Sequence, residues 1–289
     1  MQQRNLRNRV WELFSPIVLK IMVSLAVEVV VIAMFYVKYL PELSAAATQE
    51  QMMEIYLNVT SDVYKYIVEI TAISAIATMP FLILMRKNDR RREIAMDIVP
   101  NNKAPLSKYI YIVCISITFS LALNNILLLS NLAEYSIAYQ EAAEALYTPS
   151  LFVQILCLGI ITPIMEEYIF RGLVFKRLRC RVSATRAIVA SALFFGMYHG
   201  NLVQTIYGTL SGLLLGYLYE KYGSLKAPIL AHMLMNIVSC ILTEADVFTW
   251  MFSESIRMAV ITIGCAAITS IMYLYIQKIE EKPQILQEC

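Results

Sequence analysis

The chain alternates between long apolar segments and shorter polar ones. An apolar run of about 20 residues is long enough for a helix to cross the hydrocarbon core of a bilayer. Apolar segments lie near residues 21–40, 64–85, 109–129, 150–175, 187–199, 201–219, 228–242 and 256–276. The pattern therefore predicts an all-α, polytopic membrane protein in which eight transmembrane helices form one bundle.

The N-terminal segments allow two interpretations. Residues 1–20 are basic and amphipathic, with Trp11 and Phe14 among the arginines, and predict a short helix at the membrane surface. The apolar run 21–40 is followed by three alanines, as in a signal peptide. We favour an uncleaved first span, because the run is too long for a signal peptide and more spans follow it.

Charge also alternates along the chain, between the polar segments that separate the spans. Residues 86–108 contain seven Lys or Arg, and residues 176–186 form a second basic cluster. Residues 131–149 contain three glutamates and no basic residue. The positive-inside rule therefore predicts that both termini, the two basic segments and the turn 220–226 are cytoplasmic in a multi-pass cell-membrane protein.

Composition agrees with a membrane protein and argues against other classes. The chain is 58% hydrophobic and 16% charged, with a mean hydropathy of +0.60. Soluble domains carry about 25% charged residues. The net charge of +2 is too small to indicate nucleic-acid binding, so the expected partners are the lipid bilayer and a protein or peptide.

The fourth apolar segment contains two adjacent carboxylates, Glu166 and Glu167. An ionisable side chain in the middle of a membrane costs about 2.5–3.5 kcal/mol even on the mildest scale, so it indicates a functional site. Arg171 follows Glu167 by four residues and shares its helical face, where it can neutralise that carboxylate. Glu166 points elsewhere and is available for chemistry.

Both histidines of the chain, His199 and His232, lie in apolar segments. A single membrane histidine is as often structural as functional, but two beside an unpaired glutamate favour function. His232 and Asn236 are four residues apart, so they can reach one substrate atom. Residues 199–201 are predicted to form a turn within the membrane, which is tolerated only at a cavity, and we expect the active site there.

Three motifs occur in order on separate segments: Glu166-Glu167-x-x-x-Arg171, Phe195-x-x-x-His199 and His232-x-x-x-Asn236. Together they resemble the CPBP family of intramembrane proteases, which includes the CAAX prenyl endopeptidases and the Abi-type bacteriocin-processing and self-immunity proteins. The resemblance covers residues 150–243. It implies one membrane-embedded domain with a catalytic core at 150–243, preceded by spans without a signature (1–149) and followed by a last span and tail (244–289).

The resemblance also implies a role for each residue and a cavity reached from the cytoplasm. Glu166 would be the general base that activates water, with help from His199. His232 and Asn236 would stabilise the oxyanion of the tetrahedral intermediate. Glu167 and Arg171 would hold the site together.

The cofactor is left open by the residues. The family is often called a metalloprotease family, and Glu166, His199 and His232 could bind Zn²⁺. No HExxH motif is present, and the three residues come from separate segments. We therefore favour glutamate catalysis without a metal.

Two other classes of function are compatible with the pattern. A family member could act as a non-proteolytic immunity or regulatory protein that binds a peptide or membrane protein. A small-solute transporter also keeps carboxylates and histidines at the midplane, but no internal repeat is visible. Glu28, Glu69, Asn124 and Asn125 also lie in apolar runs, and we expect them to pair within the bundle.

Overall fold

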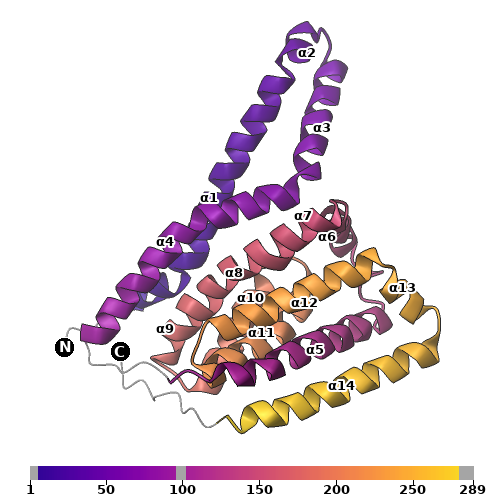
Figure 1. Ribbon diagram of the computed structural model, residues 1–289. Coiled ribbons are helices and arrows are strands. Elements are labelled where there is room, and N and C mark those ends of the chain that lie inside the picture. The colour runs from indigo at the N-terminus through magenta and orange to yellow at the C-terminus, as the bar shows by residue number, and fades with distance from the viewer. Residues whose placement is uncertain (1–5, 96–101, 280–289) are drawn as a thin grey trace.

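The computed structural model describes residues 6–95 and 102–279, and no strand occurs in these two ranges. The helices are packed side by side, except for a hairpin that projects from the bundle (Figure 1). They are α1 (Leu6–Lys38), α2 (Leu40–Ala45), α3 (Gln49–Lys65), α4 (Ile67–Ala95), η1 (Leu106–Lys108), α5 (Tyr109–Leu129), α6 (Ile137–Tyr147), α7 (Leu151–Gln154), η2 (Ile155–Ile161), α8 (Thr162–Glu167), η3 (Tyr168–Phe175), α9 (Lys176–Arg179), α10 (Ala184–Met197), α11 (Leu202–Tyr222), α12 (Lys226–Glu244), α13 (Val247–Phe252) and α14 (Ser255–Gln277).

All eight predicted segments are helical, and six of the described helical stretches are long and apolar enough to cross a membrane. The six are Val10–Lys38, Ile67–Ala95, Leu106–Leu129, Leu151–Arg179, Lys226–Glu244 and Ser255–Gln277. Helix α10 is apolar but shorter, with 14 residues. Helix α11 has 21 residues and is not among the six. The chain is therefore an all-α, multi-pass membrane protein, and the count of eight spans stays a prediction.

The first helix differs from the expected pair of a surface helix and a span. Residues 6–38 form one continuous helix, α1, with Pro16 inside it. The prediction of a separate surface helix at 1–20 was therefore wrong for residues 6–20. The apolar pattern continues across the boundary, and Leu13 and Ile17 pack against the main hydrophobic core.

Helices α1, α2 and α3 form the projecting hairpin (Figure 1). Lys38 at the end of α1 donates to Asp62 Oδ2 of α3 at 2.7 Å, and the Tyr39 hydroxyl donates to the same oxygen at 3.0 Å. These two hydrogen bonds hold the pKa of Asp62 below its usual value. At the hairpin turn, α3 begins with a capping box between Thr48 and Gln51.

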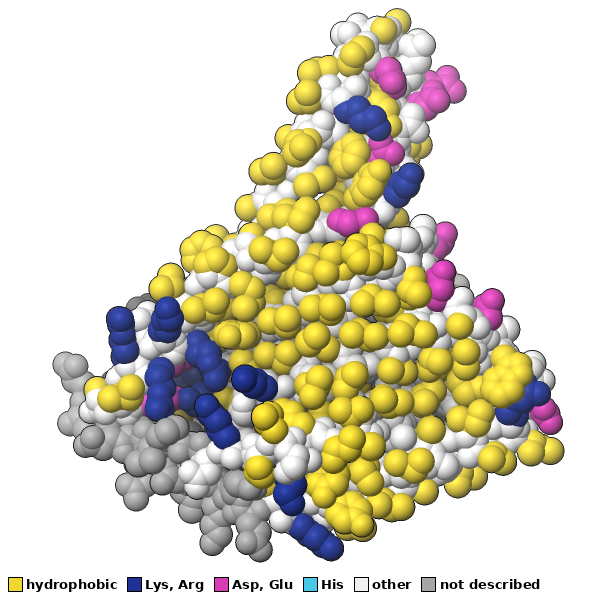
Figure 2. Space-filling model, viewed as in Figure 1, with side chains coloured by type: hydrophobic (Ala, Val, Ile, Leu, Met, Phe, Trp, Pro, Cys, Tyr) yellow, Lys and Arg dark blue, Asp and Glu magenta, His cyan; other side chains and the backbone are white. Residues whose placement is uncertain are grey.

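Basic side chains gather at one end of the bundle, which we call the basic end (Figure 2). It contains Arg92 in the last turn of α4, the basic residues of α9 and Lys221 near the end of α11. Lys221 Nζ donates to the carbonyl of Gln277 at 2.9 Å, which places the end of α14 there too. The chain ends and residues 96–101 of the basic loop lie outside the described residues, so the cytoplasmic location of the termini stays a prediction.

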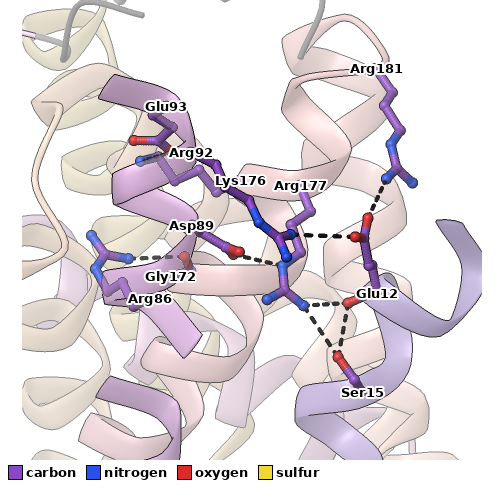
Figure 3. Close-up of polar contacts among 10 residues, drawn as sticks. All are labelled: Glu12, Ser15, Arg86, Asp89, Arg92, Glu93, Gly172, Lys176, Arg177 and Arg181. Atoms are coloured by element: carbon purple, nitrogen blue, oxygen red, sulfur yellow. Dashed lines mark hydrogen bonds and ion pairs between the residues drawn. The ribbon is translucent and has the colours of Figure 1, made fainter. Parts of the chain in front are cut away.

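Figure 3 shows how α1, α4 and α9 are joined at the basic end. Arg177 donates to Asp89 Oδ2 at 2.7 Å and also contacts the backbone carbonyl of Glu12. The Glu12 carboxylate in turn accepts from Arg92 and Arg181 at 3.4 Å. These contacts hold the basic residues of α4 and α9 against the start of α1.

Helices α10 and α11 pack closely because glycines, which have no side chain, let the two backbones approach each other. A Cβ at Gly212 would lie 2.9 Å from the Ala192 Cα, and one at Gly196 would lie 2.5 Å from the Thr205 carbonyl oxygen. Gly208 would meet the Gly196 Cα at 3.1 Å. Glycines at four-residue spacing permit such contact between membrane helices. Gly208 and Gly212 therefore give α11 a close-packing face towards α10.

The fourth predicted span is not a regular α-helix. It contains two π-helical stretches, η2 and η3, on either side of α8, which carries Glu166 and Glu167. π-Helical turns are rare and are found mostly at functional sites. Wide turns leave carbonyls to be satisfied by other groups, and Arg86 Nη1 donates to the Gly172 carbonyl at 2.9 Å. Ser191 Oγ donates to the Phe170 carbonyl at 3.0 Å.

Candidate active site

A cavity of about 690 Å³ lies inside the bundle. Four of the six candidate site residues line it, from α8, the α10–α11 turn and α12: Glu166, His199, His232 and Asn236. Most of the other lining residues are apolar or uncharged polar. The structure therefore brings these four residues, far apart in the sequence, to one enclosed space.

Glu167 and Arg171 lie behind the cavity wall, and both side chains are fully buried. Arg171 Nη1 donates to Glu167 Oε1 at 2.7 Å, so the ion pair expected from their spacing is present. Arg171 Nη2 donates to the Gly212 carbonyl at 3.1 Å, and the guanidinium lies 4.5 Å from the centre of the Phe195 ring. Arg171 thus links α8–η3 to the α10–α11 pair.

Glu167 also orients His232. The Glu167 Oε1 atom lies 2.9 Å from His232 Nδ1, in addition to its contact with Arg171. An ionised carboxylate can only accept hydrogen bonds, so Nδ1 carries a proton. The other ring nitrogen, Nε2, faces Glu166 Oε2 at 3.7 Å, just beyond hydrogen-bond distance. Nothing in the spacing of the motifs indicated that one carboxylate would serve both Arg171 and His232.

His199 is held in one orientation by the turn that it occupies. Its Nδ1 lies 2.8 Å from the Phe195 carbonyl oxygen, which can only accept, so Nδ1 carries the proton. The Phe195 ring meets the imidazole edge to face, with centroids 4.9 Å apart. Gly200 follows with φ of 80°, and Asn201 caps α11. The predicted turn at 199–201 is present, and Nε2 of the neutral ring is left as an acceptor.

Asn236 is positioned by the first π-helical stretch. Its Nδ2 donates to the carbonyl of Leu158 in η2 at 2.9 Å. Gly159, the next residue, permits this approach, because a Cβ there would lie 2.7 Å from Ile237 Cγ1. One amide proton of Asn236 is thereby used, and the second is available to another acceptor.

The comparisons with known proteins agree with this arrangement. Residues 148–238, which include all six site residues, match a family model described as "Type II CAAX prenyl endopeptidase Rce1-like". A Bacillus subtilis (strain 168) protein described as "Putative membrane peptidase YdiL" is 30% identical over 112 residues. Together the two matches support a CPBP-type core in this chain.

Both matches cover only part of the chain. The residues aligned with the Bacillus subtilis relative are 39% of this chain and 46% of that protein, so less than half of each protein is compared. No solved structure matches the chain.

The cavity extends away from the basic end. Its outer wall is formed by α6, by Leu127 and Leu128 near the end of α5, and by Thr243 near the end of α12. None of its lining residues is a lysine or arginine. We expected access from the cytoplasm, with the basic segments on that side. The described cavity extends towards the end opposite the basic residues, and its access from the cytoplasm stays a prediction.

One ring nitrogen of each histidine is held within the chain: His232 Nδ1 lies against Glu167, and His199 Nδ1 against the Phe195 carbonyl. Each Nε2 is the nitrogen left for another partner. Within residues 6–95 and 102–279, no group of three His, Cys, Asp or Glu side chains is arranged to hold a metal ion. The set expected for zinc, Glu166, His199 and His232, is therefore not assembled as ligands in this geometry.

Two of the four polar residues that were expected to pair within the bundle, Asn124 and Asn125, do so. Asn124 Nδ2 donates to the Ser120 carbonyl at 2.9 Å and to Ser239 Oγ at 3.2 Å. Asn125 Nδ2 donates to Thr262 Oγ1 at 3.0 Å. Glu69 differs, because its buried Oε2 has no hydrogen-bond partner among the described groups. Asn124 also lines the cavity, a position that its sequence context did not indicate.

Proposed function

We propose that this chain is an intramembrane endopeptidase that hydrolyses a peptide bond of a membrane-associated protein or peptide. The observation that carries the proposal is the shared cavity, where a carboxylate, two oriented imidazoles and an amide meet. The CPBP family core at residues 148–238 supports the same class of reaction.

In the proposed reaction, Glu166 is the general base. Its carboxylate accepts a proton from a water molecule, whose oxygen attacks the carbonyl carbon of the scissile bond. His199 Nε2 accepts a hydrogen bond from the second proton of this water and so orients it. This orientation requires the Nδ1–H group to keep its hydrogen bond to the Phe195 carbonyl, which lies 2.8 Å away.

The tetrahedral intermediate carries a negative oxygen that needs donors. The second amide proton of Asn236 supplies one, and His232 Nε2 supplies another when the ring carries both protons. Glu167 stabilises that protonated ring through its contact with Nδ1. Glu166 then gives its proton to the leaving nitrogen, so the C–N bond breaks and the products are a carboxylic acid and an amine.

We propose that this reaction needs no metal. The support is that, among the described residues, Glu166, His199 and His232 do not form a group arranged to hold a metal ion. Each remaining nitrogen has a role above that a bound metal would prevent. The distinction between the two chemistries is tested below with a chelator.

The substrate can be identified by comparing the membrane proteomes of cells with and without the active protein. A prenylated CAAX protein, a bacteriocin leader and a signalling propeptide are all compatible with an apolar cavity that holds one carboxylate. Cells with the active protein and cells with Glu166→Ala should differ in the membrane proteome by an uncleaved precursor in the variant. If the proteins of the two membrane proteomes have the same N- and C-termini, no precursor is cleaved, and the non-proteolytic immunity or regulatory role is the better account.

A further inference from the structure

Asn124 lies in α5 and lines the cavity, but the proposed reaction gives it no role. Helix α5 is outside residues 148–238, so the match to the family model does not cover it. A polar side chain inside a membrane bundle is costly unless its groups are hydrogen-bonded, and it serves either the packing of the helices or a ligand. The hydrogen bonds of Asn124 distinguish these two roles.

The side-chain amide of Asn124 is held on its nitrogen side only. Nδ2 donates to the Ser120 carbonyl at 2.9 Å and to Ser239 Oγ of α12 at 3.2 Å. A carbonyl can only accept, so Nδ2 and not Oδ1 faces Ser120. No hydrogen bond to Oδ1 occurs among the described residues, and Oδ1 is not one of their buried atoms that lack a partner, so it is accessible. Asn124 therefore presents a fixed acceptor that the bundle leaves unused.

Ser239 places this acceptor one helical turn from the proposed reaction centre. It follows Asn236 by three residues on α12, about 4.5 Å along the helix axis, and both residues line the cavity. The same face of α12 continues to Thr243, at the outer part of the cavity. The acceptor on Asn124 and the donor on Asn236 are therefore neighbours on the cavity wall, in the direction in which the cavity extends.

A substrate in this cavity needs acceptors for its N–H groups as well as donors for the oxyanion. The scissile carbonyl must be free of helical hydrogen bonds when water attacks it, so the bound segment is extended. Inside a membrane, an unwound N–H group without a partner is costly. Glu166 and His199 are used to bind water in the proposed reaction, so neither of them satisfies the substrate's main chain.

An extended peptide fits the pair of groups on the cavity wall. In a strand, the N–H and the C=O of one residue point to the same side, as in an antiparallel pair in which two residues exchange both hydrogen bonds. One residue spans about 3.3 Å of a strand, which is comparable to the separation of one turn on α12. The residue whose C=O faces Asn236 can therefore direct its own N–H to Asn124 Oδ1.

We propose that Asn124 is a substrate-binding residue, whose Oδ1 accepts the N–H of the substrate residue that contributes the scissile carbonyl. The inference rests on the proposed function and adds to it a binding group from a helix outside the matched core. The ligand is the main chain of an extended peptide, whatever its side chains. This hydrogen bond fixes the register of the peptide, so that one carbonyl and not its neighbours lies between Glu166 and Asn236.

A substrate with one N–H group replaced by oxygen tests the proposal. The probe is a synthetic peptide that covers the cleaved segment of the precursor found in Glu166→Ala membranes. It is made as the amide and with a backbone ester in place of the N–H of the residue before the scissile bond. Wild-type protein in lipid vesicles should cleave the ester form with a KM about tenfold higher and kcat little changed, because a hydrogen bond present before and during the reaction is lost. An ester one residue further towards the N-terminus should have no such effect, since that N–H points to the other side.

Asn124→Leu identifies the acceptor of this N–H. The variant keeps the size of the side chain without the acceptor, so it should cleave the amide and the ester peptides with the same KM. Its KM for the amide peptide should equal that of wild-type protein for the ester peptide. Asn124→Asp keeps an acceptor oxygen and should restore most of the difference. An ester effect as large in Asn124→Leu as in the wild type would assign the N–H to another group and overturn the proposal.

Asn125 supplies the matched control on the same helix. It is fully buried and faces α14, where its Nδ2 donates to Thr262 Oγ1 at 3.0 Å. Asn125→Leu should leave the ester effect at its wild-type size. If Asn124→Leu does not accumulate, the two ester positions in wild-type protein decide, and an equal effect at both would overturn the proposal.

The outcomes separate this inference from the function on which it rests. Cleavage of the amide and ester peptides with the same KM by wild-type protein would leave the proposed function intact and overturn only the role of Asn124. If wild-type protein cleaves no precursor, the proposed function fails, and the role of Asn124 fails with it.

Discussion

Glu167 holds two members of the candidate site in place through one oxygen atom. Its Oε1 accepts from Arg171 at 2.7 Å and from His232 Nδ1 at 2.9 Å. The contact with Arg171 was predictable from the four-residue spacing, because both residues lie on one helix. The contact with His232 joins residues 65 positions apart and depends on how α12 packs against α8, which no local pattern encodes.

Removal of Arg171 should destabilise the protein. Arg171→Ala leaves the fully buried Glu167 carboxylate without its cation, which costs about 3–5 kcal/mol when an ion pair is this deeply buried. We expect a large fall in melting temperature in detergent, together with loss of activity. Arg177→Ala, which breaks a partly exposed contact at the basic end, is the control and should cost less. A stable but inactive Arg171→Ala protein would mean that Arg171 contacts the substrate.

The absence of a metal requirement can be tested on the purified protein. If Glu166 and the histidines act as proposed, a strong chelator leaves activity unchanged and purified protein carries no stoichiometric metal. Loss of activity with chelator and recovery with Zn²⁺ would show that His199 and His232 are ligands instead.

At the scale of the helices, the positions of the apolar segments were predictable and their internal geometry was not. Run length and polar boundaries predict α5, α12 and α14 within a few residues, whereas α4 continues to Ala95, well past the predicted end of its span at residue 85. The π-helical stretches η2 and η3 depend on donors from other helices, such as Asn236 and Arg86, so the apolar pattern shows no trace of them. The prediction of a separate surface helix was wrong, because the polar residues at its expected end do not interrupt the helical hydrogen bonds of α1.

The close packing of α10 on α11 predicts the effect of one methyl group. In Gly212→Ala, the new Cβ would lie 2.9 Å from the Ala192 Cα and 3.3 Å from Arg171 Nη2. The backbones must separate, so we expect a loss of about 1–3 kcal/mol and reduced activity. Gly264→Ala on α14, where no atom lies within 4 Å of the added Cβ, is the control and should be neutral or stabilising. Equal melting temperatures for the two variants would contradict the tight interface.

At the scale of the whole molecule, the two ends of the bundle differ. One end is basic, and the cavity extends towards the other. Basic residues gather where α4, α9 and α11 end (Figure 2). The cavity extends towards α6 and the end of α5. Composition predicted the charge asymmetry, because loop charges can be read in sequence order. The direction of the cavity could not be predicted, because it depends on which side chains fill the bundle at each level.

Labelling from each side of the membrane tests the predicted topology. Single cysteines replacing Arg91 and Tyr135, both exposed, should react with an impermeant reagent from opposite sides once the native cysteines are removed. The positive-inside rule places Arg91→Cys in the cytoplasm. Labelling of both from outside would contradict the arrangement and, with it, the side to which the cavity leads.

The central claim is that Glu166 activates water to hydrolyse a peptide bond in this cavity. The most direct measurement uses purified protein in lipid vesicles, the accumulated precursor and water enriched in oxygen-18, with Glu166→Gln as the matched variant. Wild-type protein should cleave the precursor and place one heavy oxygen from water in the new C-terminal carboxylate. Glu166→Gln keeps the shape of the side chain without its basicity, so it should fold, bind the precursor and leave it intact. Cleavage by Glu166→Gln at the wild-type rate, or binding of the precursor by wild-type protein without cleavage, would contradict the account.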